Sequence, residues 1–276
     1  MATRTTKALV GALVAAAVAV GGAFGLHALW SVAKDHFTSD TCTVGGYTLD
    51  PDQAAVASTM VGAVTMYRIK LPERAAVLAL AAALQESKLR NLASGAGDRD
   101  SVGVLQQRPS QGWGNGNAQV LTDVGEATKE FLDALVKIPH WRTLPLEVAV
   151  QDVQISADGQ AYKQHEPEAQ ALADALTGKR PKGISCTFST PTKVAAPAVV
   201  AGQAVAQLGV NPPASDAKTV RVPGAGWQTA AWFVANADRL GIEKVAYAGN
   251  QWTRTGGWSK STTATRSAVV ATMYAL

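Results

Sequence analysis

The chain has 276 residues, of which 47% are hydrophobic and 17% are charged, so it is long enough for two compact domains and too apolar to be disordered. Its 25 basic and 21 acidic residues leave a formal charge of +4, too small an excess to indicate a nucleic-acid-binding protein. Two cysteines and four histidines exclude cysteine-rich zinc modules and scaffolds held by many disulfides. The chemistry must come from carboxylates, amides and hydroxyls, and we predict no metal and no cofactor.

An apolar segment follows Arg4 and Lys7 near the start of the chain. Residues 8–33 contain no Asp, Glu, Lys or Arg. As a helix this segment would span roughly 39 Å, enough to cross a bilayer, and the basic residues before it place its amino end in the cytoplasm. A cleaved signal peptide is the closer alternative, because residues 23–25 form a small-x-small triplet that a signal peptidase accepts. We therefore expect residues 1–40 to be a single-pass anchor at the cell membrane with the body outside, or the signal peptide of a secreted protein.

The two cysteines, Cys42 and Cys186, lie at the two ends of a long segment. A disulfide persists in an exported chain, so we predict that they are bonded rather than two free thiols. Closing a loop of this length stabilises the fold by roughly 4 to 5 kcal/mol in the chain-entropy model. The bond would join the two edges of one domain.

Between the cysteines the pattern is helical, with no convincing alternation of apolar and polar residues of the kind found in strands. Glycines and aspartates over 91–103 indicate a loop. We predict an all-α domain over residues 41–186. Proline and acidic start signals with apolar periodicity place its helices over 51–67, 72–88, 122–137, 145–154 and 167–176.

The composition changes after this domain. Residues 187–202 contain prolines with several alanines and valines, as an extended linker does. Residues 203–276 have the pattern of a small α/β domain. Its expected elements are a helix over 226–240, strands over 244–247 and 267–276, and a hairpin turn at 255–257. The predicted architecture is multi-domain: a transmembrane helix, an all-α domain and a small α/β domain.

The candidate catalytic cluster follows the second predicted helix. Glu86 lies in the last turn of that helix after an apolar run, and both the apolar surroundings and the negative end of the helix dipole disfavour its anion. A glutamate in such a place can act as a general acid. Asp98 and Asp100 in the following loop could hold a water opposite the acid. Taken alone, these residues also fit a solvated helix end and ordinary turn chemistry.

Residues 80–113 resemble the catalytic motif of soluble lytic transglycosylases and goose-type lysozymes. Glu86-Ser87-Lys88-Leu89 leads to Ser101-Val102-Gly103-Val104-Leu105-Gln106, as the family's Glu-Ser pair leads to a later Gly-x-x-Gln segment. The resemblance covers about residues 47–178 and implies a lysozyme-like domain with Glu86 as the catalytic acid/base. The Gly97-Asp98-Arg99 triplet resembles the goose-type loop, whose aspartate positions water.

The chain departs from the goose-type pattern at Arg108, where those enzymes have a further aspartate. The departure weakens an inverting, water-activating mechanism and leaves Asp98 or Asp100 as substitutes. Lytic transglycosylases need only the glutamate, because a group of the substrate itself closes an anhydro ring. A wall-binding protein with weak or no turnover is therefore the alternative to an enzyme.

The family's substrate would be the peptidoglycan glycan strand, cut at the β-1,4 bond between N-acetylmuramic acid and N-acetylglucosamine. Trp113 could stack on a sugar or anchor its loop, and Tyr162 fits a packing role equally well. The oligomeric state is not indicated. The expected substrate-binding residues are Ser87, Gly103, Gln106, Gln107, Trp113, Gln154, Ser156 and Tyr162.

The tail resembles a small domain at the carboxyl end of secreted actinobacterial wall-associated proteins. The resemblance depends on Trp227-Gln228-Thr229-Ala230-Ala231-Trp232 and Gly249-Asn250-Gln251-Trp252-Thr253. Distant relatives of that domain are zinc carboxypeptidases, but no His or Cys follows Cys186 in this chain. We therefore expect the tail to be a non-catalytic binding or scaffolding module.

Overall fold

The structure is a computed structural model that describes residues 40–156 and 158–275. The expected membrane segment, residues 8–33, lies outside the described residues. Within those residues, every helix is too short or too polar to span a bilayer.

The helices expected in the first part of the chain are present, with ends shifted by one or two residues in most cases. α2 begins directly after its N-cap residue, Asp50, which forms a capping box with Gln53. α3 ends because Lys88 adopts a left-handed conformation with φ 55°. The α-helices are α2 (Pro51–Thr65), α3 (Arg74–Ser87), α4 (Ala118–Thr122), α5 (Val124–Leu135), α6 (Leu146–Gln154) and α7 (Glu166–Leu176), and the 3₁₀ helices are η1 (Pro109–Gln111), η2 (Trp113–Gly116) and η3 (Gly159–His165).

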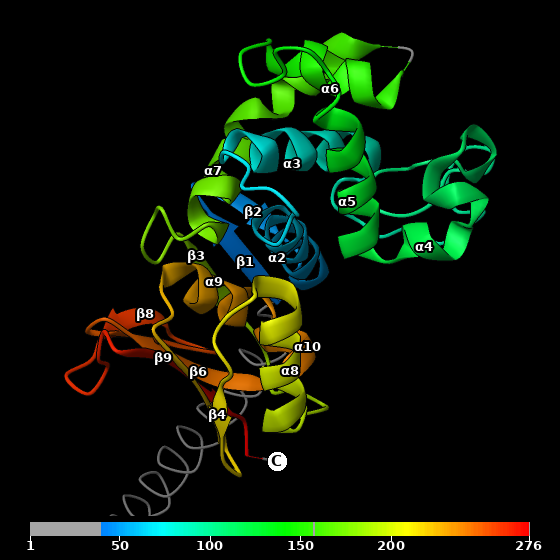
Figure 1. Ribbon diagram of the computed structural model, residues 1–276. Helices are drawn as coiled ribbons and strands as arrows, with labels where there is room; N and C mark the ends of the chain where they lie inside the picture. The colour runs from blue at the N-terminus through cyan, green and yellow to red at the C-terminus, as the bar shows by residue number, and fades with distance from the viewer. Residues whose placement is uncertain (1–39, 157, 276) are drawn as a thin grey trace, which may run out of the picture. The chain divides into compact units, whose positions relative to one another are not determined.

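The alanine-rich helix α3 is the centre of this part of the fold (Figure 1). Every residue from Ala75 to Leu84 is buried, and α3 contacts α2, α5, α6, α7 and η3. Small side chains on all sides allow several helices to pack closely around one. The carboxyl end of α3 emerges from this core, and it is this end that carries Glu86.

The prediction of an all-α domain is wrong. The segment 41–186 contains a three-stranded antiparallel sheet of order β2-β1-β3, whose last strand ends one residue beyond it. Strands of three or four residues are too short to show a period of two, and β3 pairs with a strand far away in the sequence, so no local pattern reveals them. The described fold is mixed α/β, and an all-α lysozyme-like domain is not supported. The strands are β1 (Thr41–Val44), β2 (Tyr47–Leu49) and β3 (Ile184–Thr187).

The predicted disulfide is confirmed. Cys42 on β1 and Cys186 on β3 are direct partners in the strand register, and their sulfurs are bonded at 2.01 Å. Both residues are buried. The bond therefore fastens the start of the described chain to the strand that leads into the tail.

The tail contains the second sheet, which has six antiparallel strands in the order β4-β5-β9-β6-β7-β8. The predicted hairpin is present between β7 and β8, and the helix expected over 226–240 is divided at Asn236. The end of the expected linker is helical, because α8 begins at Pro197. The elements are α8 (Pro197–Leu208), β4 (Ala214–Ser215), β5 (Thr219–Pro223), α9 (Trp227–Ala235), α10 (Ala237–Leu240), β6 (Ile242–Tyr247), β7 (Asn250–Thr253), β8 (Gly257–Lys260) and β9 (Ala268–Met273).

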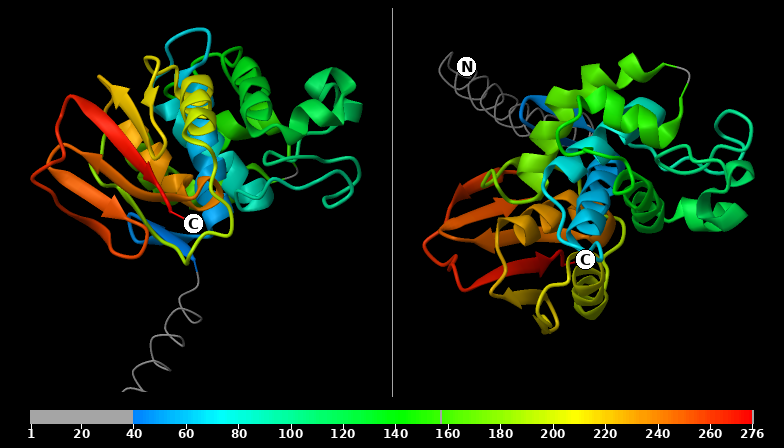
Figure 2. Two further views of the ribbon diagram at one scale, coloured as in Figure 1. Left: turned by 90° about the horizontal axis from the view of Figure 1, so that it is seen from below. Right: turned by 45° about the horizontal axis from the view of Figure 1, so that its top comes forward.

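Helix α9 forms a layer between the six-stranded sheet and the helices of the first part (Figure 2). It contacts β6 and β9 on one side and α2 and α7 on the other. Two tail tryptophans bond the small sheet: Trp252 Nε1 donates to the carbonyl of Cys186 at 3.0 Å, and Trp258 Nε1 donates to that of Ile184 at 2.7 Å. The described residues therefore pack as one unit.

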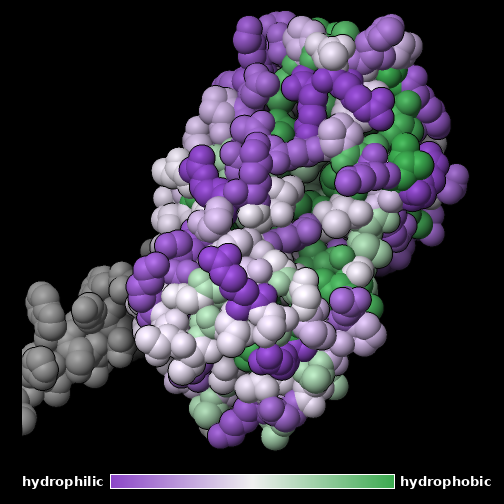
Figure 3. All heavy atoms as spheres, turned by 60° about the vertical axis from the view of Figure 1, so that its left-hand side comes forward, coloured by the Kyte–Doolittle hydropathy of each residue, from purple (hydrophilic) through white to green (hydrophobic). Residues whose placement is uncertain are grey.

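The opposite face of the six-stranded sheet is turned to solvent. Its exposed positions are polar, as at Arg221 on β5 and Ser259 on β8. Figure 3 shows the lower part of the molecule mostly in white and purple, the colours of weakly polar and hydrophilic residues. Along β5 and β7, buried residues alternate with more exposed ones, as expected for a sheet covered on one side.

Candidate functional site

A cleft of about 630 Å³ opens beside the carboxyl end of α3. Its walls come from that helix end, from the loop that follows it and from the end of α6. The structure thus brings together side chains that are up to 70 positions apart in the sequence, from Glu86 to Ser156. The predicted site residues that line the cleft are Glu86, Asp98, Gln106, Gln107, Trp113, Gln154 and Ser156.

Glu86 is half-buried in the cleft wall and is held by a buried tyrosine. Tyr162 Oη donates to Glu86 Oε1 at 2.5 Å. Burial, followed by the hydrogen bond to Glu86, raises the pKa of Tyr162, so the phenol stays protonated and keeps its role as a donor. Tyr162 has no exposed surface and does not line the cleft. It fixes the position of Glu86 and leaves Oε2 outside this bond.

Ser87 and Gly103 were predicted to bind substrate, but neither lines the cleft. The Ser87 hydroxyl donates to the carbonyl of Val104 at 2.7 Å, which joins the end of α3 to the cleft loop. Gly103 has φ 78°, and a Cβ there would lie 2.1 Å from the carbonyl oxygen of Leu121. Both residues therefore hold the wall in place, and no other residue type fits at Gly103 without movement.

Three of the four glutamines that line the cleft also brace it. The side-chain amide of Gln106 donates to Gly103, that of Gln107 to Ala127 and that of Gln154 to Leu105, all at backbone carbonyls 2.8 to 3.2 Å away. Within the described residues, the buried Oε1 of Gln107 has no hydrogen-bond partner. A buried amide oxygen without a partner is costly, so Gln107 lowers the stability of the cleft wall at this point.

Asp100 does not line the cleft, because it is engaged elsewhere. It accepts hydrogen bonds from Arg108 Nε and from the backbone N–H of Ser110, both at 2.8 Å. Hydrogen bonds from Ser110 and Arg108 hold the pKa of Asp100 well below its usual range. Asp98 does line the cleft, but its side chain is 88% exposed and lies 3.8 Å from Arg99 Nε. The sequence reasoning did not foresee that Arg108 would pair with one of the two candidate aspartates.

The rim of the cleft also includes Ile155, which the sequence reasoning missed. It ends α6 in a left-handed conformation with φ 50°, and it is 83% exposed. A β-branched residue in that conformation is strained. No sequence signal distinguishes it, because isoleucine is an ordinary residue at the end of an apolar helix face.

Ser156 and Trp113 complete the predicted set. Ser156 Oγ donates to Gln151 Oε1 at 2.6 Å, and Trp113 is partly buried against the core while it lines the cleft. Among the residues described, no three His, Cys, Asp or Glu side chains gather closely enough to hold a metal ion. The polar groups of the cleft are amides, hydroxyls, two arginines and the carboxylates of Glu86 and Asp98. This combination can bind an uncharged, hydroxyl-rich ligand and donate one proton to it.

No protein-family model matches the chain, and a comparison with curated proteins finds no match. The functional assignment therefore depends on the geometry of the cleft and on the sequence motif that led to it.

Proposed function

We propose that the protein is a peptidoglycan-cleaving glycosidase, either a lytic transglycosylase or a muramidase. It acts on the β-1,4 bond between N-acetylmuramic acid and N-acetylglucosamine, and Glu86 is its general acid/base. The observation that carries the proposal is the placement of Glu86 in the wall of an open cleft, with Oε1 held by Tyr162. A wall substrate lies outside the cytoplasm, so residues 8–33 act either as a membrane anchor or as a cleaved signal.

Glu86 performs two proton transfers in the proposed reaction. Because Tyr162 donates to Oε1, the proton of the acid form resides on Oε2. Oε2 delivers it to the glycosidic oxygen as the bond to the sugar carbon breaks, and positive charge develops on that carbon and the ring oxygen. The resulting carboxylate then takes a proton from the attacking hydroxyl. That hydroxyl is the one on carbon 6 of the muramic acid; in inverting hydrolysis the attacker is water instead, and a second carboxylate takes its proton.

The second carboxylate decides between these two attackers. Hydrolysis with inversion requires a carboxylate that activates water on the opposite side of the sugar. Asp100 is bonded to Arg108 and Ser110, and Asp98 is extended into solvent, so Asp98 is the remaining candidate for this role. An engaged Asp100 and a largely solvated Asp98 both weaken the case for a base that activates water. The two aspartates therefore favour attack by the 6-hydroxyl, which forms an anhydro ring and needs no second carboxylate.

A second candidate function is wall binding without turnover. It is favoured by Arg108, which lines the cleft at the position where an acid is expected and engages Asp100 at 2.8 Å. A cleft that kept its amides and Trp113 would still hold a glycan after losing its base.

The test is mass spectrometry of purified peptidoglycan after incubation with the full chain. We expect soluble fragments with anhydro ends from the unaltered protein and none from Glu86→Gln, with both proteins melting at the same temperature. Glu243→Gln, an exposed glutamate of β6 that does not line the cleft, is the matched control and should keep full activity. Activity retained by Glu86→Gln would refute the acid role. Sedimentation with insoluble peptidoglycan and no products would favour wall binding.

A further inference from the structure

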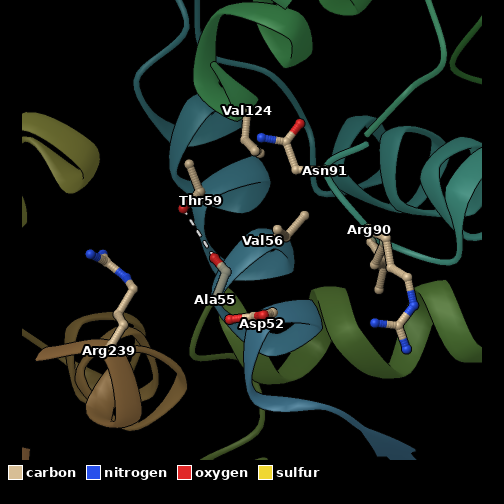
Figure 4. A pocket seen from close by; sticks show the side chains of 9 residues that line it. Asp52, Ala55, Val56, Thr59, Arg90, Asn91, Val124 and Arg239 are labelled. Carbon is tan, nitrogen blue, oxygen red and sulfur yellow. Dashed lines mark hydrogen bonds between the residues drawn. The ribbon is translucent and has the colours of Figure 1, made fainter. Parts of the chain in front are cut away.

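A groove runs along α2, on the other side of the segment that follows α3. Two adjoining cavities, of about 390 and 590 Å³, share Thr59, Val124 and Arg239 and so form one continuous groove. Figure 4 shows α2 along its floor, with Arg239 on one side and Val124 and Asn91 on the other. The groove thus has one wall from the first part of the chain and one from the tail.

The tail wall presents N–H donors. Arg239 donates Nε to Asn236 at 2.6 Å and Nη1 to the Oε1 of Gln203 at 2.8 Å, and its Nη2 makes no hydrogen bond to any described residue. Gln207 Oε1 accepts from Trp232 Nε1 at 2.7 Å, which fixes the side chain and leaves its Nε2 without a partner in the described part of the chain. Arg239, Gln203 and Gln207 therefore offer donors along one side of the groove.

The remaining lining includes carboxylates. Asp52 in the first turn of α2 is exposed and forms no ion pair with any described residue, and Asp123 lies at the start of α5. Between them the floor of the groove is apolar, with Val56 and Ala63 half-buried or buried. Two further cations line the groove, but both are paired: Arg90 with Asp50 and Lys129 with Glu126. The donors of Arg239, the carboxylate of Asp52 and the apolar floor fit an extended peptide that bears both carboxylate and ammonium groups.

The groove and the catalytic cleft lie against the same stretch of backbone. Asn91 lines the groove and the next residue, Leu92, lines the cleft. The carbonyl of Leu92 accepts from Gly103 N–H at 2.8 Å, so this stretch is held in place. The cleft and the groove are therefore separated by one thickness of backbone, and a branched polymer in the cleft would place its side chain in the groove by passing around this stretch.

We propose that the groove binds the peptide stem of the glycan strand whose sugars occupy the cleft. The inference rests on the proposed function, which identifies the polymer as peptidoglycan. The stem is a short peptide with several carboxylates and, where its third residue is a diamino acid, a free ammonium group. Arg239 receives a stem carboxylate, and the groove acids receive the ammonium. The tail thereby selects glycan strands that carry peptides.

The direct test measures binding of a synthetic stem tetrapeptide, with a diamino acid at its third position and a fluorophore at its amino end, to the full chain. Ala206→Trp places a bulky ring in the groove from an exposed position of α8, and Ala198→Trp makes the same change on α8 outside the groove. We expect at least tenfold weaker binding for Ala206→Trp and unchanged binding for Ala198→Trp. Arg239→Gln should weaken binding about tenfold, whereas Arg221→Gln, an exposed arginine of β5, should not.

Each outcome bears on one proposal. Absence of peptide binding, or equal losses for the two tryptophan variants, overturns the stem site. A dimer that Ala206→Trp dissociates would assign the groove to a second copy of the chain and overturn it too. Cleavage of glycan without peptide binding refutes the stem site alone. Peptide binding together with cleavage by Glu86→Gln refutes the catalytic assignment and leaves the stem site intact.

Discussion

Replacing Tyr162 with phenylalanine is the sharpest test of how the site is organised. The change removes the hydroxyl that lies 2.5 Å from Glu86 Oε1 and keeps a ring that is fully buried. A hydrogen bond to a charged group contributes about 1.5 to 3 kcal/mol, and each 1.36 kcal/mol corresponds to a tenfold change in rate. We therefore expect kcat to fall about 10- to 100-fold. KM should change little, because Tyr162 does not line the cleft.

Tyr67 provides a matched control. Its hydroxyl donates to Asp133 Oδ1 at the same distance, 2.5 Å, and neither residue lines the catalytic cleft. Tyr67→Phe should lower the free energy of unfolding as much as Tyr162→Phe does and leave kcat unchanged. The assays are release of anhydro ends from purified peptidoglycan and unfolding in urea. Unaltered kcat in Tyr162→Phe, or an equal loss in Tyr67→Phe, would refute the reasoning.

Three further predictions concern the fold and the shape of the cleft. Replacing Cys42 and Cys186 by serine opens a loop of 144 residues and should lower the unfolding free energy by roughly 4 to 5 kcal/mol, measured in urea. Burial and the hydrogen bond to Asp133 raise the pKa of Tyr67 to about 12, so folding favours the neutral phenol. The stability that Tyr67 contributes is lost as the pH rises from about 10 to about 12. In a titration followed by tyrosinate absorbance, Tyr67→Phe should remove the component whose midpoint is about 12. Gly97→Ala would place a Cβ 2.0 Å from Gln106 Oε1 and should destabilise the protein by about 1 to 3 kcal/mol and weaken glycan binding, measured by unfolding and by sedimentation with peptidoglycan.

Local signals predicted the helices but not the small sheet. α2 and α3 were visible because a proline followed by an acidic residue marks the start of each, at Pro51-Asp52 and Pro72-Glu73. Strands β1 and β3 form because they pair with each other, as Thr41 does with Thr187. Neither strand shows a pattern of alternating apolar and polar residues in its own sequence. α8 was hidden for a different reason: its alanines and valines resembled a linker, and burial against β5 and α2 makes them helical.

The candidate site shows the same division. The motif around Glu86 identified the helix end and most of the cleft lining, because those residues lie within a short stretch of sequence. Tyr162 was placed in the right region, but its bond to Glu86 spans 76 positions and could not be predicted. The pairing of Asp100 with Arg108 depends on the fold of the loop rather than on spacing. Pairing of this kind removes a charge that sequence reasoning counted as available.

The carbonyls of β3 that accept from Trp252 and Trp258 have an evolutionary consequence. Recombination that exchanged the tail for another segment would remove two indole donors from the strand that carries Cys186, and Gly178, which fits against Trp227 and Gln228, would face an unfilled hollow. Exchanging the tail by recombination at this junction would therefore destabilise both the first part of the chain and the tail. The two halves should be inherited as a pair, and a fragment ending near residue 187 should be poorly soluble when it is expressed alone.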